Sequence, residues 1–142
     1  MSEFIEISNY EGKGYQPLVS FEKWRVAVLR HLEETDPGNL DRMERHMQTD
    51  EIFILVRGTA ILLAGGSGNA PAYVEACPMQ PGVVYNVKKS VWHTCSLSCD
   101  AHVVIIENDD TGKMNSEYAM LSNGDRLKAQ NDAALWMVKQ KE

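Results

Sequence analysis

The sequence has no long apolar run and little positive charge. None of its apolar stretches approaches the roughly 20 residues that a membrane-spanning helix needs, so we expect no membrane-spanning segment. It holds 14 lysines and arginines against 20 aspartates and glutamates, a formal net charge of -6. A protein that binds nucleic acid through its phosphates needs a positive face, so this balance argues against nucleic acid as a partner. The charge balance does not exclude a small anionic ligand that a few local cations hold.

Cysteine is also scarce, and its spacing matters. The three cysteines, Cys77, Cys95 and Cys99, form no C-x-x-C pair and cannot all be bridged. A structural zinc site needs four ligands, which Cys95 and Cys99 alone do not supply. The first six residues lack the basic and apolar regions of a secretory signal. We therefore expect reduced thiols and a cytoplasmic location.

The sequence also lacks the fingerprints of several enzyme classes. We find no nucleophile elbow, no phosphate-binding loop and no dinucleotide fingerprint. Apolar residues make up 44% and charged residues 24% of the 142, which is ordinary for a globular protein. This length predicts a single domain that spans residues 1–142.

What the chain does contain is a series of short β-like runs separated by glycine and proline turns. Such a series predicts an all-β sandwich or barrel, with a core over about residues 15–121, and argues against βαβ units. In the tail, Leu127, Leu135 and Val138 fall near helical spacing after the start signal Asn123-Gly124-Asp125, which predicts a helix over about 125–139. The expected strands are residues 24–32, 43–47, 51–57, 59–64, 73–77, 83–87, 92–98 and 101–107.

Four potential metal ligands occupy ordered positions on these strands. Glu44 and His46 are two residues apart, so both side chains leave the same face of a strand. Glu51 begins the next strand, and His93 lies on a separate strand far along the chain. A barrel brings such strands side by side with their inward faces converging on a cavity. Imidazole and carboxylate ligands together suit first-row divalent ions such as Mn, Fe, Co, Ni or Zn.

These residues resemble the first motif of the cupin superfamily, G-x5-H-x-H-x(3,4)-E-x6-G. The chain offers Gly38, Glu44, His46, Glu51 and Gly58 with every spacing in agreement. One residue type departs, because Glu44 stands where the family usually has its first histidine.

The second cupin motif, G-x5-P-x-G-x2-H-x3-N, is matched less well. Gly82 and His93 agree with it, whereas Lys88, Ser90 and Leu97 replace its proline, glycine and asparagine. The two motifs follow each other in the right order, and together they cover about the central third to half of the chain.

The resemblance implies a double-stranded β-helix (jelly-roll) cupin barrel with a C-terminal α-helix, often dimeric, and one divalent metal near the barrel mouth. By position its metal ligands are Glu44, His46, Glu51 and His93. Glu44 has two roles open to it: a direct ligand, or a carboxyl beside the metal that moves a proton in catalysis. The fold hosts very different chemistries, so it does not fix the reaction.

Other side chains are candidates for contact with an organic ligand. Arg25 and His31 share one face of their strand, with Arg30 on the other, and a guanidinium suits a carboxylate or phosphate. Tyr85 is a candidate pocket wall, because its hydroxyl needs a partner when buried. We expect Trp92 to serve packing and Cys95 to act as a small hydrophobe. We expect His102 and Glu107 at the surface.

The strand Glu51–Arg57 is apolar on both faces, which indicates that other parts of the protein, or a partner, pack against both faces. One face would line the barrel, and the other would meet a second layer, the terminal segments or another subunit. A homodimer is one hypothesis that follows.

Two functions remain open at this stage. The first is a metal-dependent isomerase, epimerase, lyase or oxygenase that acts on a small polar metabolite, such as a sugar or a hydroxy or keto acid. The second is a non-catalytic cupin that binds a small ligand or serves in regulation, which the departures in the second motif favour.

Overall fold

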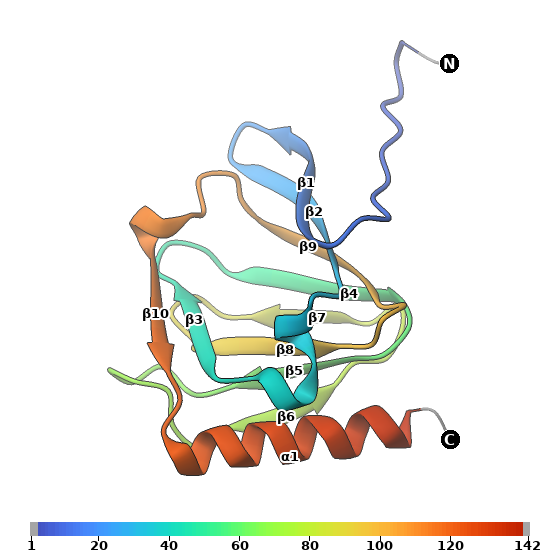
Figure 1. The fold of residues 1–142 in the computed structure, drawn as a ribbon. Helices are drawn as coiled ribbons and strands as arrows, with labels where there is room; N and C mark the ends of the chain where they lie inside the picture. Colours follow the sequence, from blue (N-terminus) through green and yellow to red (C-terminus); the bar gives the residue numbers. More distant parts are fainter. Residues whose placement is uncertain (1–2, 141–142) are drawn as a thin grey trace.

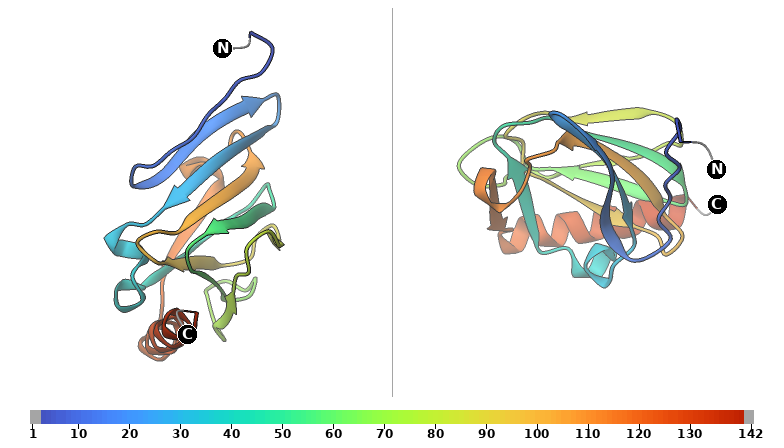
Figure 2. Two further views of the ribbon diagram at one scale, coloured as in Figure 1. Left: turned by 90° about the vertical axis from the view of Figure 1, so that its right-hand side faces the viewer. Right: turned by 90° about the horizontal axis from the view of Figure 1, so that it is seen from above.

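In the computed structural model, which describes residues 3–140, two five-stranded antiparallel sheets face each other and one helix lies along the second sheet (Figures 1 and 2). The first sheet has the order β1-β2-β9-β4-β7 and the second β10-β3-β8-β5-β6. The first sheet consists of β1 (Gly14–Phe21), β2 (Trp24–Arg30), β9 (His102–Asn108), β4 (Glu51–Arg57) and β7 (Val84–Val87). The second consists of β10 (Ser116–Met120), β3 (Arg42–His46), β8 (His93–Leu97), β5 (Ala60–Ala64) and β6 (Glu75–Pro78).

The all-β jelly-roll architecture and the C-terminal helix are confirmed. All eight expected strands are present, with ends within about two residues of the expected ones. Strand pairing does not close the barrel: over residues 3–140 the backbone ladders run within each sheet and none joins the two sheets. Short 3-10 turns connect some strands: Glu33–Thr35, Pro37–Asn39 and Lys113–Asn115.

Two strands, β1 and β10, were not expected from the sequence, and both lie at sheet edges. The strand β1 carries Pro17, which has no N–H to donate. An edge strand tolerates a proline because its outer side pairs with no other strand. The register of β1 with β2 shifts between Pro17 and Val19. Most of β10 is exposed or half-buried, so its alternation of apolar and polar residues is weak. Edge strands need little apolar surface, so the hydrophobic pattern gave little signal for either.

The core has two layers that meet in β5. The layer between the sheets contains Leu62 of β5, Phe53 and Leu55 of β4, and Val103 and Ile105 of β9. The second layer lies between the second sheet and the helix and contains the other face of β5, with Ile61 and Leu63. Both faces of β5 are therefore buried, which explains its apolar sequence AILLA.

The helix α1 (Asn123–Lys139) begins at Ser122, whose hydroxyl accepts a hydrogen bond from the backbone N–H of Asp125. Its buried face differs from the expected one. Leu127, Leu135 and Val138 are half or more exposed, whereas Ala129 and Ala133 are fully buried. These two small residues lie one turn apart on the same face and let the helix backbone approach the sheet closely. The packing face is therefore marked by alanines and not by large apolar residues.

The turn between β4 and β5 depends on Gly58, the last glycine of the first motif. Gly58 has a φ of +80°, and a Cβ at this position would lie 2.6 Å from the Cα of Ala101. Only glycine combines this left-handed backbone with so close an approach. The turn thereby fixes where β4 ends and β5 begins.

The outward face of the first sheet carries two rows of aligned apolar side chains, which we call the outer rows. Strand register aligns the first row across β2, β9 and β4, and extends the second row to β7. Most of these side chains are half-buried, and Val84 is 60% exposed, so the described residues leave this face only partly covered. The outer rows are Val26, Ile106 and Ile52, and Val28, Val104, Ile54 and Val84.

Among the described residues, no helix is both long and apolar enough to span a membrane.

Candidate metal centre

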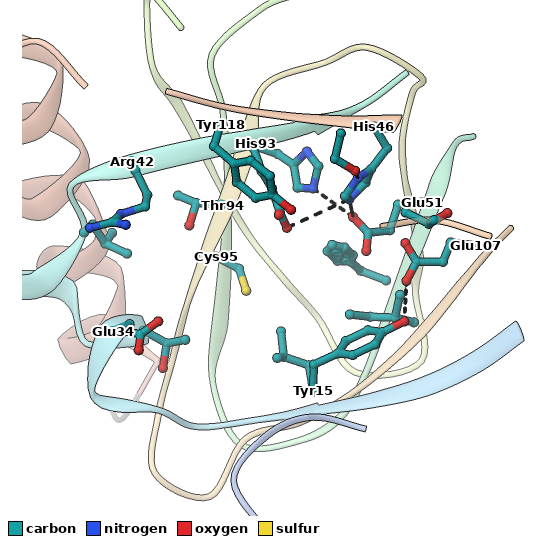
Figure 3. A pocket seen from close by; sticks show the side chains of 18 of the residues that line it. Tyr15, Glu34, Arg42, His46, Glu51, His93, Thr94, Cys95, Glu107 and Tyr118 are labelled. Atoms are coloured by element: carbon teal, nitrogen blue, oxygen red, sulfur yellow. Dashed lines mark hydrogen bonds and ion pairs between the residues drawn. The ribbon is translucent and has the colours of Figure 1, made fainter. Parts of the chain in front are cut away.

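A cavity of about 880 Å³ opens between the two sheets, and the predicted metal ligands line one side of it (Figure 3). His46 on β3 and His93 on β8 enter it from the second sheet. Glu51 enters from the first sheet as the first residue of β4. Residues from both layers thus meet at one place.

The strand pairing explains how the second sheet presents its ligands. Glu44 and His46 alternate with Arg45, so both side chains leave the inward face of β3. Glu44 lies directly opposite His93 in the antiparallel pairing of β3 with β8. Residues directly opposite on one face have neighbouring side chains, which brings three of the four predicted ligands together.

The two imidazoles converge on one carboxylate. Nε2 of His93 lies 2.8 Å from Oε1 of Glu51, and Nε2 of His46 lies 3.2 Å from the same oxygen. The two rings are 5.2 Å apart, edge to face. Glu44 is close to this group, with its Oε1 3.9 Å from Nε2 of His46. The structure therefore brings all four residues into one cluster.

Hydrogen bonds on the far side of each ring fix the imidazoles. The Nδ1–H of His93 donates to the backbone carbonyl of Val91 at 2.9 Å, and Nδ1 of His46 is 2.8 Å from the hydroxyl of Ser116. Such a bond at Nδ1 leaves Nε2 directed into the site, which is the usual arrangement for a histidine ligand.

Burial and pairing together set the charges in the cluster. Glu51 is 5% exposed, and its burial alone would raise its pKa, but the hydrogen bonds from His46 and His93 lower the pKa of Glu51 to about 2. Burial lowers the pKa of each histidine, and the bond to Glu51 outweighs it, so both histidine pKa values are raised. The cluster thus combines a stable carboxylate with two basic imidazoles.

Glu44 has a different environment from Glu51. Its side chain is 41% exposed at the cavity side of β3. Partial burial raises the pKa of Glu44, with the charge of Glu51 adding to this and the two histidines opposing it.

The cluster fits a divalent transition metal ion. Ligand atoms about 2.1 Å from one ion lie about 3 Å apart when they are at right angles, close to the 2.8 and 3.2 Å observed here. Candidate ligand atoms of Glu44, His46 and His93 also lie within 4.8 Å of one another. The donor set of imidazoles and carboxylates is the one that Mn, Fe, Co, Ni and Zn share.

The turn before His93, where the chain departs from the second motif, has a left-handed backbone at Ser90. Ser90 stands at the motif's glycine position and has a φ of +70°, the left-handed backbone that favours glycine. Its N–H donates to the carbonyl of His46 at 2.9 Å, which joins the turn to β3. The serine therefore adopts the conformation that a glycine would adopt more easily.

The candidates for ligand contact divide between the cavity and the rest of the molecule. Arg25 lines the cavity. His31 and Tyr85 are not among the lining residues: Nε2 of His31 lies 2.6 Å from Asp36, and the hydroxyl of Tyr85 accepts a hydrogen bond from the N–H of Gln80. Trp92 is buried against the helix layer, in agreement with its expected packing role.

Cys95 lines the cavity beside the cluster, and burial raises its pKa to about 12. A thiol with so high a pKa stays protonated, which agrees with the expected role of a small hydrophobe.

The structure corrects the expectation that Glu107 and His102 lie at the surface. Glu107 is 5% exposed and lines the cavity, and His102 is also buried. Alternation along β9 would have predicted this for Glu107, because Val103, Ile105 and Glu107 share the inward face. Tyr15, a second missed residue, lines the cavity from the unpredicted strand β1.

Solved structures with the same architecture match this chain at low sequence identity. KdgF from a Halomonas species matches with a TM-score of 0.51 and 16% identity, over 70% of this chain and 81% of its own. A variant of PAC13 from Streptomyces, solved with uridine, matches with a TM-score of 0.54 and 10% identity, over 82% of this chain and 88% of its own.

A third match is HppE with Fe(II) and its substrate, at a TM-score of 0.51 and 16% identity, over 76% of this chain and 59% of that one. No protein-family model matches the chain, and no curated protein sequence does.

Proposed function

We propose that this protein, which has the cupin fold, is an enzyme that uses a divalent transition metal ion to act on a small polar metabolite. The observation that carries the proposal is the convergence of His46, Glu51 and His93, with Glu44 beside them, on one side of a cavity of about 880 Å³. When bound there, a metal ion supplies a Lewis acid for a carbonyl, hydroxyl or carboxylate oxygen, the chemistry of isomerases, epimerases, lyases and, with iron, oxygenases.

The chain's own residues hold and shield the site. His46 and His93 present Nε2 to the cavity because Ser116 and Val91 engage their other ring nitrogen. Phe53 and other apolar side chains of the cavity wall limit the water that reaches the cluster, which strengthens every polar contact inside it. The aliphatic, phenylalanine and thiol-bearing lining residues among the described residues are Leu29, Leu40, Phe53, Cys95 and Ile105.

Glu44 is the candidate proton carrier. Its side chain is 41% exposed and lies within 3.9 Å of His46, so it reaches both solvent and the cluster. A carboxyl in that position can accept a proton from a bound metabolite and release it to water. A role as a fourth metal ligand is its alternative, and the Glu44→Gln variant separates the two by metal content.

The matched structures give this proposal general support. HppE contains Fe(II) with its substrate, and the PAC13 structure contains uridine. The fold therefore holds a metal ion in one of those proteins and a small organic ligand in another. The metabolite proposed for this chain is a sugar or a hydroxy or keto acid.

The metal part of the proposal is tested by metal content. We expect purified protein to contain, or to take up, about one equivalent of Mn, Fe, Co, Ni or Zn, measured by elemental analysis and titration calorimetry. His46→Ala and His93→Ala should lose that metal, whereas His31→Ala, a matched change outside the cavity, should keep it. Wild-type protein that binds none of the five metals would refute the proposal.

A non-catalytic cupin that binds a small ligand is the second candidate. The replacement of three second-motif residues by Lys88, Ser90 and Leu97 favours it, because a site without turnover tolerates such changes. His46→Ala and His93→Ala discriminate between the two: loss of turnover of an identified substrate supports the enzyme, whereas loss of metal with retained ligand affinity supports the binding module.

We further propose that two copies of the chain associate through the outer rows of the first sheet. Partly covered apolar rows on a sheet face are typical of a surface that meets a partner. The two rows present the same kind of surface to a second copy, which suits a symmetric dimer.

A further inference from the structure

Glu107 is a buried carboxylate with one unused oxygen. Its side chain is 2% exposed, and it lines the cavity next to Glu51 (Figure 3). Oε2 of Glu107 accepts a hydrogen bond from the hydroxyl of Tyr15 and pairs with Nη2 of Arg25 at 3.3 Å. Within residues 3–140, Oε1 has no hydrogen-bond partner. Leaving a buried acceptor without a hydrogen bond costs free energy, so we expect this oxygen to accept a hydrogen bond from a donor outside the chain.

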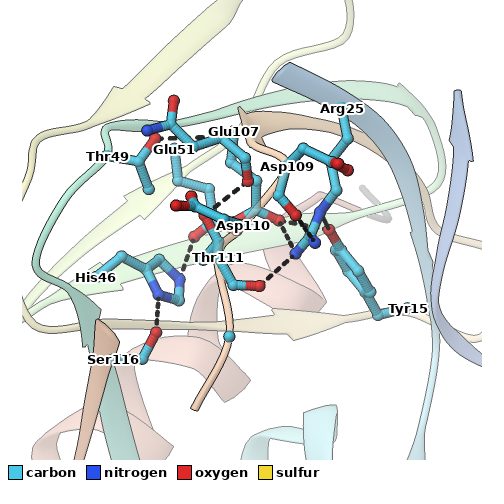
Figure 4. Close-up of polar contacts among 12 residues, drawn as sticks. Tyr15, Arg25, His46, Thr49, Glu51, Glu107, Asp109, Asp110, Thr111 and Ser116 are labelled. Atoms are coloured by element: carbon cyan, nitrogen blue, oxygen red, sulfur yellow. Dashed lines mark hydrogen bonds and ion pairs between the residues drawn. The ribbon is translucent and has the colours of Figure 1, made fainter. Parts of the chain in front are cut away.

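The group that holds Glu107 is rigid. Arg25 donates from Nε to the hydroxyl of Tyr15 at 2.9 Å, from Nη1 to the carbonyl of Asp109 at 2.8 Å, and from Nη2 to the carbonyl of Thr111 at 3.0 Å (Figure 4). Glu107 is therefore fixed before any ligand arrives. The N–H groups of Arg25 already donate to groups of the chain, so Arg25 has few donors free to bind an anionic ligand.

Negative charge predominates around the cavity. Of the residues that the structure describes, two present guanidinium groups to it, Arg25 and Arg42, and Arg42 is paired with Asp41 through two hydrogen bonds of 2.8 and 3.1 Å. Both lining arginines thus already have carboxylate partners. Within residues 3–140 six carboxyl groups line the cavity: those of Glu33, Glu34, Asp41, Glu44, Glu51 and Glu107.

We propose that Glu107 is a substrate-contacting residue whose free oxygen accepts a hydrogen bond from a hydroxyl group, and that the cavity selects neutral polyhydroxy ligands over carboxylates and phosphates. The proposal rests on the proposed function only in that the ligand enters the same cavity. A hydroxyl satisfies the buried oxygen without adding charge. A carboxylate or phosphate adds like charge to a wall that already carries an excess of it.

A competing role for Glu107 is metal binding. Candidate ligand atoms of His46, Glu51 and Glu107 lie within 4.8 Å of one another. The two roles differ in one readout, because a ligand-contacting carboxylate can be neutralised without loss of the metal, whereas a metal ligand cannot.

The test measures ligand binding and metal content on the same samples. Glucose, glucuronate and glucose 6-phosphate share one ring and differ at one carbon, and ribose with ribose 5-phosphate forms a second matched set. Binding of each is followed by ligand-observed NMR and calorimetry to wild type, to Glu107→Gln and to Glu75→Gln, a matched change at an exposed position outside the cavity.

We expect the neutral sugars to bind wild type about tenfold or more tightly than their charged counterparts, because like charge at the cavity wall opposes the acid and phosphate groups. Glu107→Gln should weaken neutral-sugar binding by a similar factor, the worth of about one hydrogen bond to a charged group, with unchanged metal content, and Glu75→Gln should change it little. Because the amide of Gln can still accept through its oxygen, Glu107→Leu should abolish the contact.

Four results would overturn the inference: stronger binding of the acids or phosphates, no binding of either neutral sugar, unaltered sugar binding by Glu107→Leu, or loss of metal from Glu107→Gln. Protein that binds neutral sugars but no metal would leave the inference standing and refute the proposed metal enzyme instead. Thermal unfolding of each variant separates loss of contact from loss of fold.

Discussion

Ser90 maintains a left-handed backbone in the turn that leads to His93, at a cost that glycine would not incur. We expect Ser90→Gly to raise the free energy of unfolding by up to about 1 kcal/mol, because glycine adopts this conformation freely. Urea denaturation measures the change. Ser67→Gly, at an exposed loop position without a positive φ, should give no gain, and a Ser90→Gly variant less stable than wild type would contradict the reasoning.

Single residues of the cluster were accessible from the sequence to differing degrees. Spacing predicted one shared strand face for Glu44 and His46, and both side chains lie on the inward face of β3. Glu107 was expected at the surface because it lies near the end of an apolar strand, where charged residues are commonly exposed. Alternation with Val103 and Ile105 gives its inward face, but its contacts with Tyr15 and Arg25, which lie more than 80 positions away, have no local signal in the sequence.

Among the elements, the central strands were predictable and the edges were not. The strands β4, β5 and β9 are covered by other layers, so their sequences carry strong apolar signals. The edge strands β1 and β10 take part in one pairing each, and their sequences are correspondingly mixed. The helix was found by its start signal, but its buried alanines were not recognised as the packing face.

The segment that precedes β1 is tied to the first sheet through Glu11. Its carboxylate is 2.6 Å from Arg30 of β2 and 2.8 Å from Arg57 of β4. The hydrogen bonds from these two arginines lower the pKa of Glu11 to about 2. Because the folded-state pKa is below the unfolded one, this contribution to stability is present above about pH 4.5 and is lost as the pH falls towards 2.

We therefore expect Glu11→Gln to unfold at a lower temperature than wild type at pH 6, and the difference to shrink as the pH falls from 4.5 to 3. Calorimetry or circular dichroism at several pH values measures it. Glu6→Gln, on the same segment, serves as the control. A difference that stays constant over this pH range would show that Glu11 does not act through its charge.

For the whole molecule, the outer rows predict a dimer. Light scattering of wild type should give twice the chain mass of 15.9 kDa, and Val84→Glu, which places a charge in the second row, should give monomers. Met114→Glu, a matched change at a fully exposed methionine elsewhere, should leave the dimer intact. Wild-type particles of 15.9 kDa alone would remove the dimer.

The two sheets share no ladder of hydrogen bonds within residues 3–140, yet Glu51 from one and the histidines from the other meet at a single carboxylate oxygen. An ion coordinated by these three side chains would cross-link layers that are otherwise joined by side-chain packing and side-chain hydrogen bonds. Its removal would then speed amide hydrogen exchange along β3, β8 and β4 together, beyond the three ligand residues themselves. Occupancy would set the rigidity of the whole sandwich as well as its chemistry.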